Sequence, residues 1–249
     1  MNEIDFSIIL PAFLAGMLVL STHVPLGMKV LARGIIFADL AVAQIAGMGV
    51  VIADLAGYAE HPLLVQLIAV SSALLGALLL TWIDRLSAKV REASIGLLFV
   101  LAASGSILLM SHDTHSGEHL KDLLVGQILW VNHVQLIATF FLSAAILFFW
   151  LQFGQQLGTF GFYAIFALAV TASVQMVGVY LVFASLIVPA LATHNLRRNQ
   201  LMLAYITGST GYAAGLLLSV WLDLPSGAAI VWAMALTGAS LLLIKRIKI

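Results

Sequence analysis

Cysteine is absent from this 249-residue chain, and charged residues make up only 9 % of it. Without cysteine, the chain can form neither disulfides nor thiolate metal sites. A soluble domain carries roughly 25 % charged residues. A chain that is 62 % hydrophobic with a mean hydropathy of +1.11 is therefore predicted to be a polytopic membrane protein. Its formal net charge of zero excludes a strongly basic nucleic-acid binder, so we expect no nucleic-acid partner.

Sequence motifs of catalysis are also missing. The chain has no GxxxxGK[ST] phosphate loop, so any ATP hydrolysis must come from another chain. It has no HExxH or GxSxG motif and no paired intramembrane carboxylates, and we therefore expect a protein that is not itself an enzyme. Because Glu3 and Asp5 replace a basic n-region, we expect no cleaved signal peptide. A single transmembrane domain is predicted over residues 1–249.

Long apolar runs predict an all-α transmembrane bundle of about eight to nine spans. The stretch 160–194 is ambiguous, because Gly178 either divides it into two helices or leaves one of the pair short or broken. The pattern Gly211-x-x-x-Gly215 predicts a face on which another helix packs closely. The expected spans are 8–27, 36–57, 63–83, 94–111, 134–153, 160–178, 180–194, 201–221 and 227–245.

Basic residues predict the orientation, because cytoplasmic loops are enriched in Lys and Arg. With the N-terminus outside and the C-terminus in the cytoplasm, all basic residues except Lys121 fall on the cytoplasmic side. These residues are Lys29, Arg33, Arg85, Lys89, Arg91, Arg197, Arg198, Lys245, Arg246 and Lys248. We expect a multi-pass protein of a cell membrane, the inner membrane of a bacterium.

The second predicted span contains one carboxylate, Asp39, and one amide, Gln44. A charge in a membrane helix costs roughly 2.5–3.5 kcal/mol on insertion scales, so such residues usually face the bundle interior or water. The same stretch is rich in small residues, which let another helix approach closely. Asp39 and Gln44 therefore line a polar path, or Asp39 is merely solvated or paired near Arg33 at the cytoplasmic end.

The most polar stretch of the chain is the predicted outer loop around residues 111–121. Imidazole and carboxylate are natural ligands of zinc, manganese and iron, and a short His-rich tract is a compositional indication of metal binding. The alternative is an ordinary solvated loop. The candidate ligands are His112, Asp113, His115, Glu118 and His119.

Three further polar residues are weaker candidates for the pathway. His23 precedes Pro25 near the inner end of the first span, although a lone histidine there is more often bonded to a neighbouring helix. Gln127 lies in an apolar stretch, 122–129, that is too short to cross the membrane. It is therefore a re-entrant or an interfacial segment. Gln175 immediately precedes the stretch bounded by Gly178 and Pro189, and interrupted helices of this kind are common around transporter pathways.

An ordered set of motifs resembles the ABC-3 family, the membrane permease subunits of ABC importers for zinc and manganese. The resemblance runs over most of the chain. Its motifs are Pro25-Leu-Gly27, Phe37-Ala-Asp39, Glu92-Ala-Ser-Ile-Gly96, Leu124-Val-Gly-Gln-Ile-Leu129, Leu186-Ile-Val-Pro-Ala190 and Pro225-Ser-Gly227.

The resemblance implies a homodimeric permease driven by a cytoplasmic ABC ATPase and supplied by an extracytoplasmic solute-binding protein. It makes Asp39 a metal-pathway residue. Two features depart from the family. Ala43 stands where a histidine is often found, and the uncharged segment 152–160 is shorter than the family's ATPase-docking stretch. Docking would then use Arg33, residues 84–92 or residues 194–200.

The sequence thus predicts the permease of an ATP-driven divalent-metal importer that works by alternating access. The expected cargo is Zn²⁺ first, with Mn²⁺ or Fe²⁺ second, and we expect no permanently bound cofactor. Two alternatives remain open. One is a stand-alone secondary transporter or channel that uses Asp39 as an ion site, and the other is a membrane scaffold that binds metal only through residues 112–119.

Overall fold

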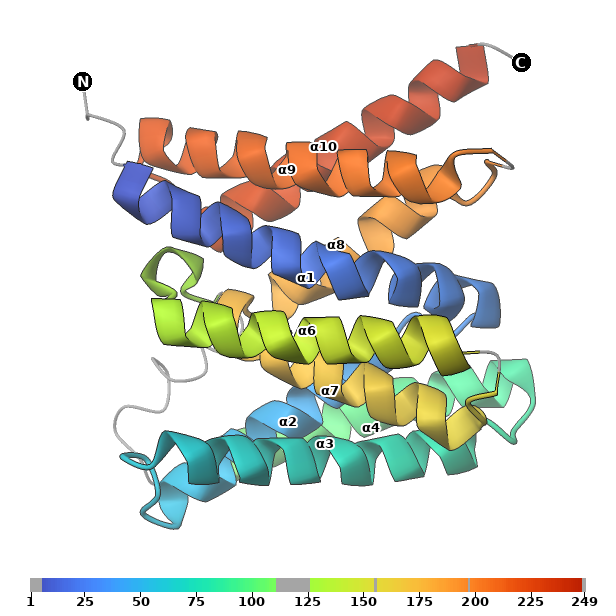
Figure 1. Cartoon of the computed structure of the whole chain (residues 1–249). Coiled ribbons are helices and arrows are strands. Elements are labelled where there is room, and N and C mark those ends of the chain that lie inside the picture. Colours follow the sequence, from blue (N-terminus) through green and yellow to red (C-terminus); the bar gives the residue numbers. More distant parts are fainter. Residues whose placement is uncertain (1–5, 111–125, 155, 197, 248–249) are drawn as a thin grey trace.

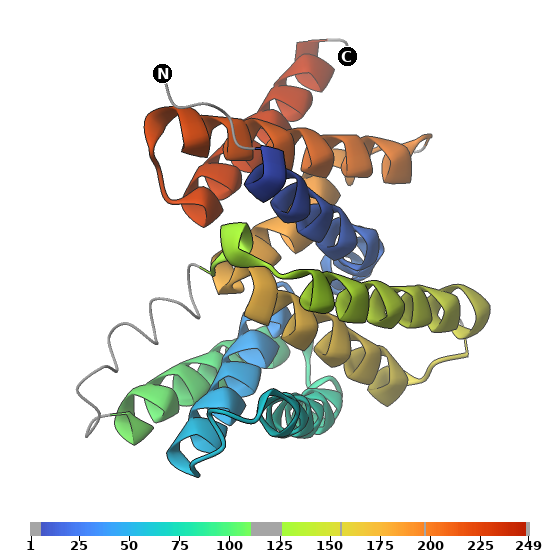
Figure 2. The same ribbon diagram turned by 60° about the vertical axis from the view of Figure 1, so that its left-hand side comes forward.

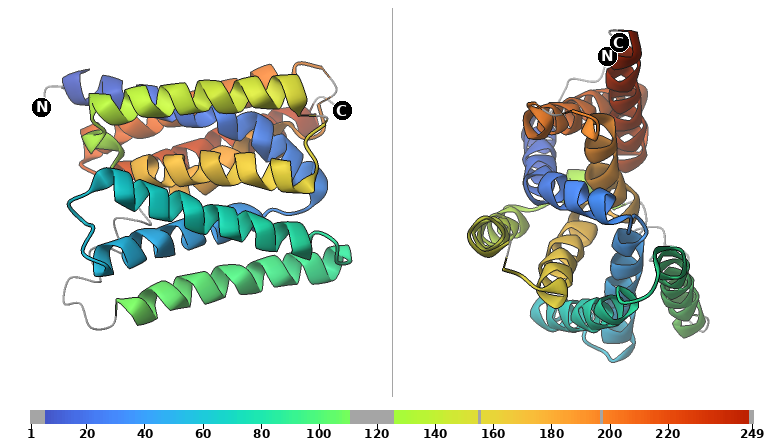
Figure 3. Two further views of the ribbon diagram at one scale, coloured as in Figure 1. Left: turned by 60° about the horizontal axis from the view of Figure 1, so that its bottom comes forward. Right: turned by 90° about the vertical axis from the view of Figure 1, so that its right-hand side faces the viewer.

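Every apolar run predicted to cross the membrane forms one helix. The computed structural model describes residues 6–110, 126–154, 156–196 and 198–247, and the long helices run side by side with their turns gathered at two opposite ends (Figures 1 and 3). The helices are α1 Phe6–Arg33, α2 Ala38–Leu55, α3 Pro62–Ile83, α4 Ala88–Leu109, α6 His133–Phe153, α7 Thr159–Val177, α8 Val179–Thr193, α9 Gln200–Leu222 and α10 Ser226–Ile247. A short 3-10 helix, η1, covers Ile128–Trp130.

Gly178 separates α7 from α8 and resolves the ambiguous stretch into two helices. Its backbone has φ 81° and ψ 162°, a conformation that is essentially restricted to glycine. Eight of the described helices are long and apolar enough to cross a membrane, and α8 is a shorter apolar helix of 15 residues. The predicted count of eight to nine spans is therefore confirmed.

Two helices, α1 and α4, extend six residues beyond a predicted limit. The predicted span 94–111 begins six residues earlier, at Ala88, because the polar residues before it continue the helix. Helix α1 passes through Pro25 to Arg33. Proline removes the N–H that would bond to the carbonyl four residues earlier. The hydroxyl of Tyr205 donates to that carbonyl, at Ser21, with an O···O distance of 2.9 Å.

The helices pack in successive groups across the bundle (Figure 2). Helices α9 and α10 lie at one side and α2, α3 and α4 at the other, with α1, α6, α7 and α8 between them. Gly211 and Gly215 of α9 lie directly against α10, where a Cβ on Gly211 would come within 2.7 Å of the Met234 Cα. The predicted GxxxG packing face is therefore confirmed.

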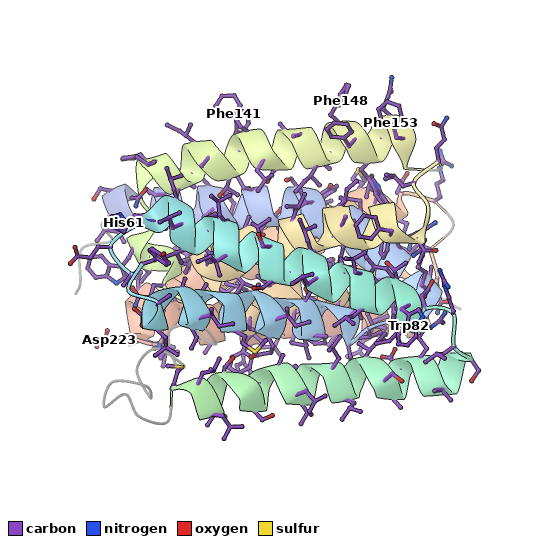
Figure 4. All side chains as sticks on the ribbon, turned by 90° about the horizontal axis from the view of Figure 1, so that it is seen from below. His61, Trp82, Phe141, Phe148, Phe153 and Asp223 are labelled. Carbon is purple, nitrogen blue, oxygen red and sulfur yellow. The ribbon has the colours of Figure 1, made fainter. Side chains whose placement is uncertain are left out.

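Large apolar side chains cover the outside of the bundle. Leu63, Leu151 and Trp221 are each about 80 % exposed, and Phe141, Phe148 and Phe153 of α6 point away from the other helices (Figure 4). A soluble protein rarely exposes large contiguous apolar surfaces. This surface therefore fits the hydrocarbon of a bilayer.

Charge divides the two ends of the bundle. Within the described residues every Lys and Arg belongs to one end, which we call the basic end, where α1 finishes and α2 begins. Asp54, Glu60 and Asp223 belong to the opposite end, which we call the acidic end. Helix α2 connects the two ends and is the most buried of the long helices.

Candidate functional site

Asp39, in the first turn of α2, is a fully buried carboxylate at the basic end. Its side chain is 0 % exposed, and neither oxygen has a hydrogen-bond partner among the described residues. Its position at a helix N-terminus offsets part of the free-energy cost of burying the charge, because the helix dipole favours an anion there. Among the described residues, the Asp39 carboxylate is neither exposed to solvent nor paired with Arg33. Such a group can bind a cation.

Gln44 is also buried, at 7 % exposure, but it does not share a face with Asp39. Residues five apart on an α-helix lie about 140° apart around its axis. The position that does share the face of Asp39 is Ala43, which offers no ligand and is 1 % exposed. Helix α2 thus presents one ionisable group at its start and an amide about 7.5 Å further along its axis.

His23 lies about 15 Å from the end of α1, within a different part of the bundle. Helix α1 packs mainly on α8 and α9, whereas α2 packs mainly on α3 and α4. The Nδ1 atom of His23 lies 3.0 Å from the carbonyl oxygen of Val19, and its Nε2 is buried without a partner in the described residues. A ring whose Nδ1–H is held by a carbonyl leaves Nε2 free as an acceptor or metal ligand.

A cluster of polar side chains from α3, α4 and α7 holds the start of α2 at the basic end. Arg91 forms an ion pair of 3.3 Å with Asp84 and donates to the carbonyl of Arg33 at 2.9 Å. The hydroxyl of Tyr163 also donates to Asp84, at 3.2 Å. The Glu92 carboxylate accepts a hydrogen bond of 3.3 Å from the N–H of residue 37, the residue that caps α2.

The Arg33 guanidinium completes this end by lying 4.1 Å from the centre of the Phe162 ring. A guanidinium over an aromatic face is an attractive cation–π contact. Sequence reasoning named Arg33 as a possible partner of Asp39, and Arg33 and residues 84–92 as possible docking segments. In the structure, Glu92 bonds the backbone two residues before Asp39, Arg91 bonds the backbone of Arg33, and the Arg33 side chain lies on Phe162.

A pocket of about 420 Å³ opens at the acidic end, between the ends of α2, α3, α4, α6 and α7 and the segment around η1. It brings together Gln127 and Gln175, which the sequence suggested separately as pathway residues. It also contains Asp54 and Gln135, which the sequence analysis did not single out. The sequence signal that could have identified Asp54 is that it is the second carboxylate in the predicted span that contains Asp39.

The 122–129 segment ends in η1 rather than in a longer helix, as far as its described residues 126–129 show. Ile128 is 1 % exposed whereas Trp130 is 78 % exposed, so the segment packs on the bundle through Ile128 and leaves Trp130 at the surface. The candidate ligands His112, Asp113, His115, Glu118 and His119 lie outside the described residues. Within the described ranges, no three His, Asp or Glu residues gather closely enough to hold a metal ion.

Known proteins resemble the chain in sequence and in fold. The manganese transport system membrane protein MntC of Halalkalibacterium halodurans is 28 % identical over 229 residues, which cover 83 % of this chain and 76 % of that protein. The structure of PsaBC from Streptococcus pneumoniae in complex with Fab matches with a TM-score of 0.75 at 23 % identity, covering 96 % of this chain and 91 % of that one.

A second solved structure is that of an inward-facing transporter assigned to the metal-chelate type of ABC transporters. It matches with a TM-score of 0.69 at 17 % identity and covers 96 % of this chain and 86 % of that one. At these identities the two structures establish a common fold. The sequence model of the ABC 3 transport family matches residues 5–162 and 154–245. Since these matches span nearly the whole sequence, the chain belongs to the ABC 3 transport family.

Proposed function

We propose that this chain is the membrane permease subunit of an ATP-driven importer of divalent metal ions, and that the metal passes beside Asp39. Membership of the ABC 3 transport family and a relative named as a manganese transport protein support this proposal. The observation that carries it is the Asp39 carboxylate, which is fully buried among apolar helices with no partner in the described residues. A buried charge without a partner is strongly unfavourable unless a cation compensates it.

The proposed cargo is manganese ahead of zinc. Sequence reasoning placed zinc first, but the curated relative is named for manganese. The polar groups on α2 and in the pocket of the acidic end provide oxygen donors, which suit manganese better than the nitrogen and sulfur donors typical of zinc. The ion is cargo, and the proposal includes no resident cofactor.

The basic end is proposed to face the cytoplasm, because Lys and Arg are enriched in cytoplasmic segments. The N-terminus would then lie outside and the C-terminus inside. A cytoplasmic ABC ATPase would dock on the basic end, and an extracytoplasmic solute-binding protein would deliver the metal to the acidic end. Two copies of the permease would alternate access to the pathway between them.

Replacing Asp39 by asparagine tests the function directly. The Asp39→Asn protein keeps the shape of the side chain but loses its charge, so we expect uptake of radioactive Mn²⁺ by cells to fall to the background of a strain lacking the gene. Asp223→Asn is the matched control. Asp223 is exposed at the acidic end with a left-handed backbone (φ 52°), which asparagine adopts readily.

Assembly is checked by asking whether Asp39→Asn still co-purifies with the ATPase subunit in mild detergent. Normal uptake by an assembled Asp39→Asn protein would remove Asp39 from the pathway. Purification of the wild-type chain without any ATPase, combined with metal uptake that persists without ATP, would instead favour the secondary transporter.

A further inference from the structure

The pocket at the acidic end has one charged group, Asp54, among its lining residues. The Asp54 side chain is exposed, and no hydrogen bond or ion pair engages its carboxylate in the described ranges. Every described Lys and Arg belongs to the opposite end of the bundle. A cleft with low-dielectric walls and charge of one sign concentrates counter-ions. The electrostatics of this pocket therefore select a cation.

Neutral oxygen donors accompany this carboxylate. Gln127 and Gln175 line the pocket from the segment before η1 and from the end of α7. The side-chain oxygen of Gln135 already accepts the N–H of Asn132 at 3.2 Å, so Gln135 is not counted as a free donor of this kind. The sulfur of Met176 likewise accepts the hydroxyl of Thr139. Three residues thus remain with oxygen atoms available to a ligand, namely Asp54, Gln127 and Gln175.

The volume of the pocket indicates whether the cation would bind with or without its shell of waters. Each water occupies about 30 Å³, so the six waters around a divalent ion fill on the order of 180 Å³. The cavity of about 420 Å³ accepts this hydrated ion. One carboxylate and two amides are too few to replace an octahedral shell of six oxygens, and Mn²⁺ and Mg²⁺ both prefer such a shell. The ion would therefore keep most of its waters.

We propose that this outer pocket is a binding site for a hydrated, oxygen-preferring divalent cation, held by Asp54 and oriented by Gln127 and Gln175. The proposal rests on the proposed function, because it makes the pocket the place where the cargo first enters the permease. It adds a second site about 22 Å along α2 from Asp39. The pocket would thus hold the divalent ion before it reaches the buried carboxylate.

Equilibrium dialysis of the purified full chain in lipid nanodiscs against MnCl₂ tests the site. All variants carry Asp39→Asn, so the buried carboxylate cannot contribute to binding. At the dielectric constant of water, a unit negative charge about 5 Å from a divalent ion contributes roughly 15-fold in affinity. We therefore expect Asp54→Asn to weaken Mn²⁺ binding about 15-fold at low salt, and less at high salt, where the charges are screened.

Two further variants make the result specific. Asp223→Asn removes a carboxylate from the same end but outside the pocket, and binding should be unchanged. Gln175→Glu adds a second carboxylate to the lining and should tighten binding, an effect that misfolding cannot produce. Equal binding by the Asp54→Asn and Asp223→Asn proteins, or no gain from Gln175→Glu, would overturn the proposed site.

Uptake measurements separate this proposal from the proposed function. With Asp39 intact, Asp54→Asn should raise the KM for Mn²⁺ and leave the maximal rate unchanged. If Asp39→Asn blocks uptake while Asp54→Asn has the KM of the wild type, the importer stands and the outer pocket fails. If the Asp39→Asn protein transports normally while dialysis shows weaker Mn²⁺ binding by the Asp54→Asn protein, the pocket binds metal and the proposed transport route past Asp39 is wrong.

Discussion

Gly126 is the position where one added methyl group should do most damage to the acidic end. Its backbone has φ 71°, a left-handed conformation that disfavours every residue with a Cβ. A Cβ built there would overlap the carbonyl carbon and oxygen of Val177 and the backbone nitrogen of Gly178. All three contacts are with backbone at the junction of α7 and α8. No side-chain rotation can relieve them.

The expected loss has two parts. Holding alanine in the left-handed region costs about 1–2 kcal/mol, and forcing a methyl group into a closely packed contact costs typically 1–3 kcal/mol. We therefore expect Gly126→Ala to lower the free energy of unfolding by about 2–5 kcal/mol. The displaced backbone is adjacent to Gln127, so Mn²⁺ binding to the outer pocket should weaken as well.

The free energy of unfolding would be measured by titrating SDS into detergent-solubilised protein and following helicity by circular dichroism. Gly96→Ala is the matched control. Gly96 lies within α4, and a Cβ there would meet nothing within 4 Å. Alanine should then stabilise the helix by roughly 0.5–1 kcal/mol. If the two variants shift the transition equally, the tight contact at Gly126 does not exist.

Two other predictions concern single hydrogen bonds. Tyr205→Phe leaves the Ser21 carbonyl without the donor that replaces the missing N–H of Pro25. The free energy of unfolding measured by SDS titration should therefore fall by about 1 kcal/mol. An unfolding transition at the same SDS concentration as the wild type would contradict this. Glu92→Ala removes the acceptor for the Phe37 N–H and should cost about 0.5–1.5 kcal/mol, whereas Glu92→Gln keeps an oxygen there and should cost less. Equal losses would show that this bond does not stabilise α2.

The helical fold was predictable because each span depends on a local property, the length of an apolar run. The sequence left open whether Gly178 divides the stretch 160–194 into two helices, and its glycine-specific conformation in the structure shows that it does. The beginning of α4 was predicted six residues too late, since hydropathy marks the hydrocarbon region and does not register the polar turns that continue a helix beyond it. The persistence of α1 through Pro25 depends on Tyr205, 184 residues away from Ser21, and no local pattern contains that contact.

The two carboxylates of α2 differ in how far sequence could reveal them. Asp39 could be singled out because a charge within an apolar run is expensive and therefore informative. Asp54 ends the same run, where a carboxylate is ordinary. It gains meaning only from the pocket, whose walls come from five long helices and the segment around η1. The interactions that fix the start of α2 through Arg91 and Glu92 are likewise tertiary and have no signature in sequence.

Helix α2 itself explains how the two carboxylates belong to one route. Asp39 and Asp54 are 15 residues apart, which places them within about 60° of each other around the helix. The positions between them on this face include Ala43 and Ala46, which offer no ligand and are buried against this chain's own helices. A cation moving along this face would thus need the route to open and would need ligands from outside α2.

Helix α4 is the neighbour of α2 that the rest of the described bundle holds least. It packs mainly on α2 and is the least buried of the eight long helices, with 17 % of its apolar window buried. The side chains of Arg91 and Glu92 bond α4 to other segments at the basic end. Its exposed apolar surface leaves room for the second permease copy of the proposed dimer, which is a source of ligands from outside α2. We therefore expect the pathway to be complete only in the proposed dimer.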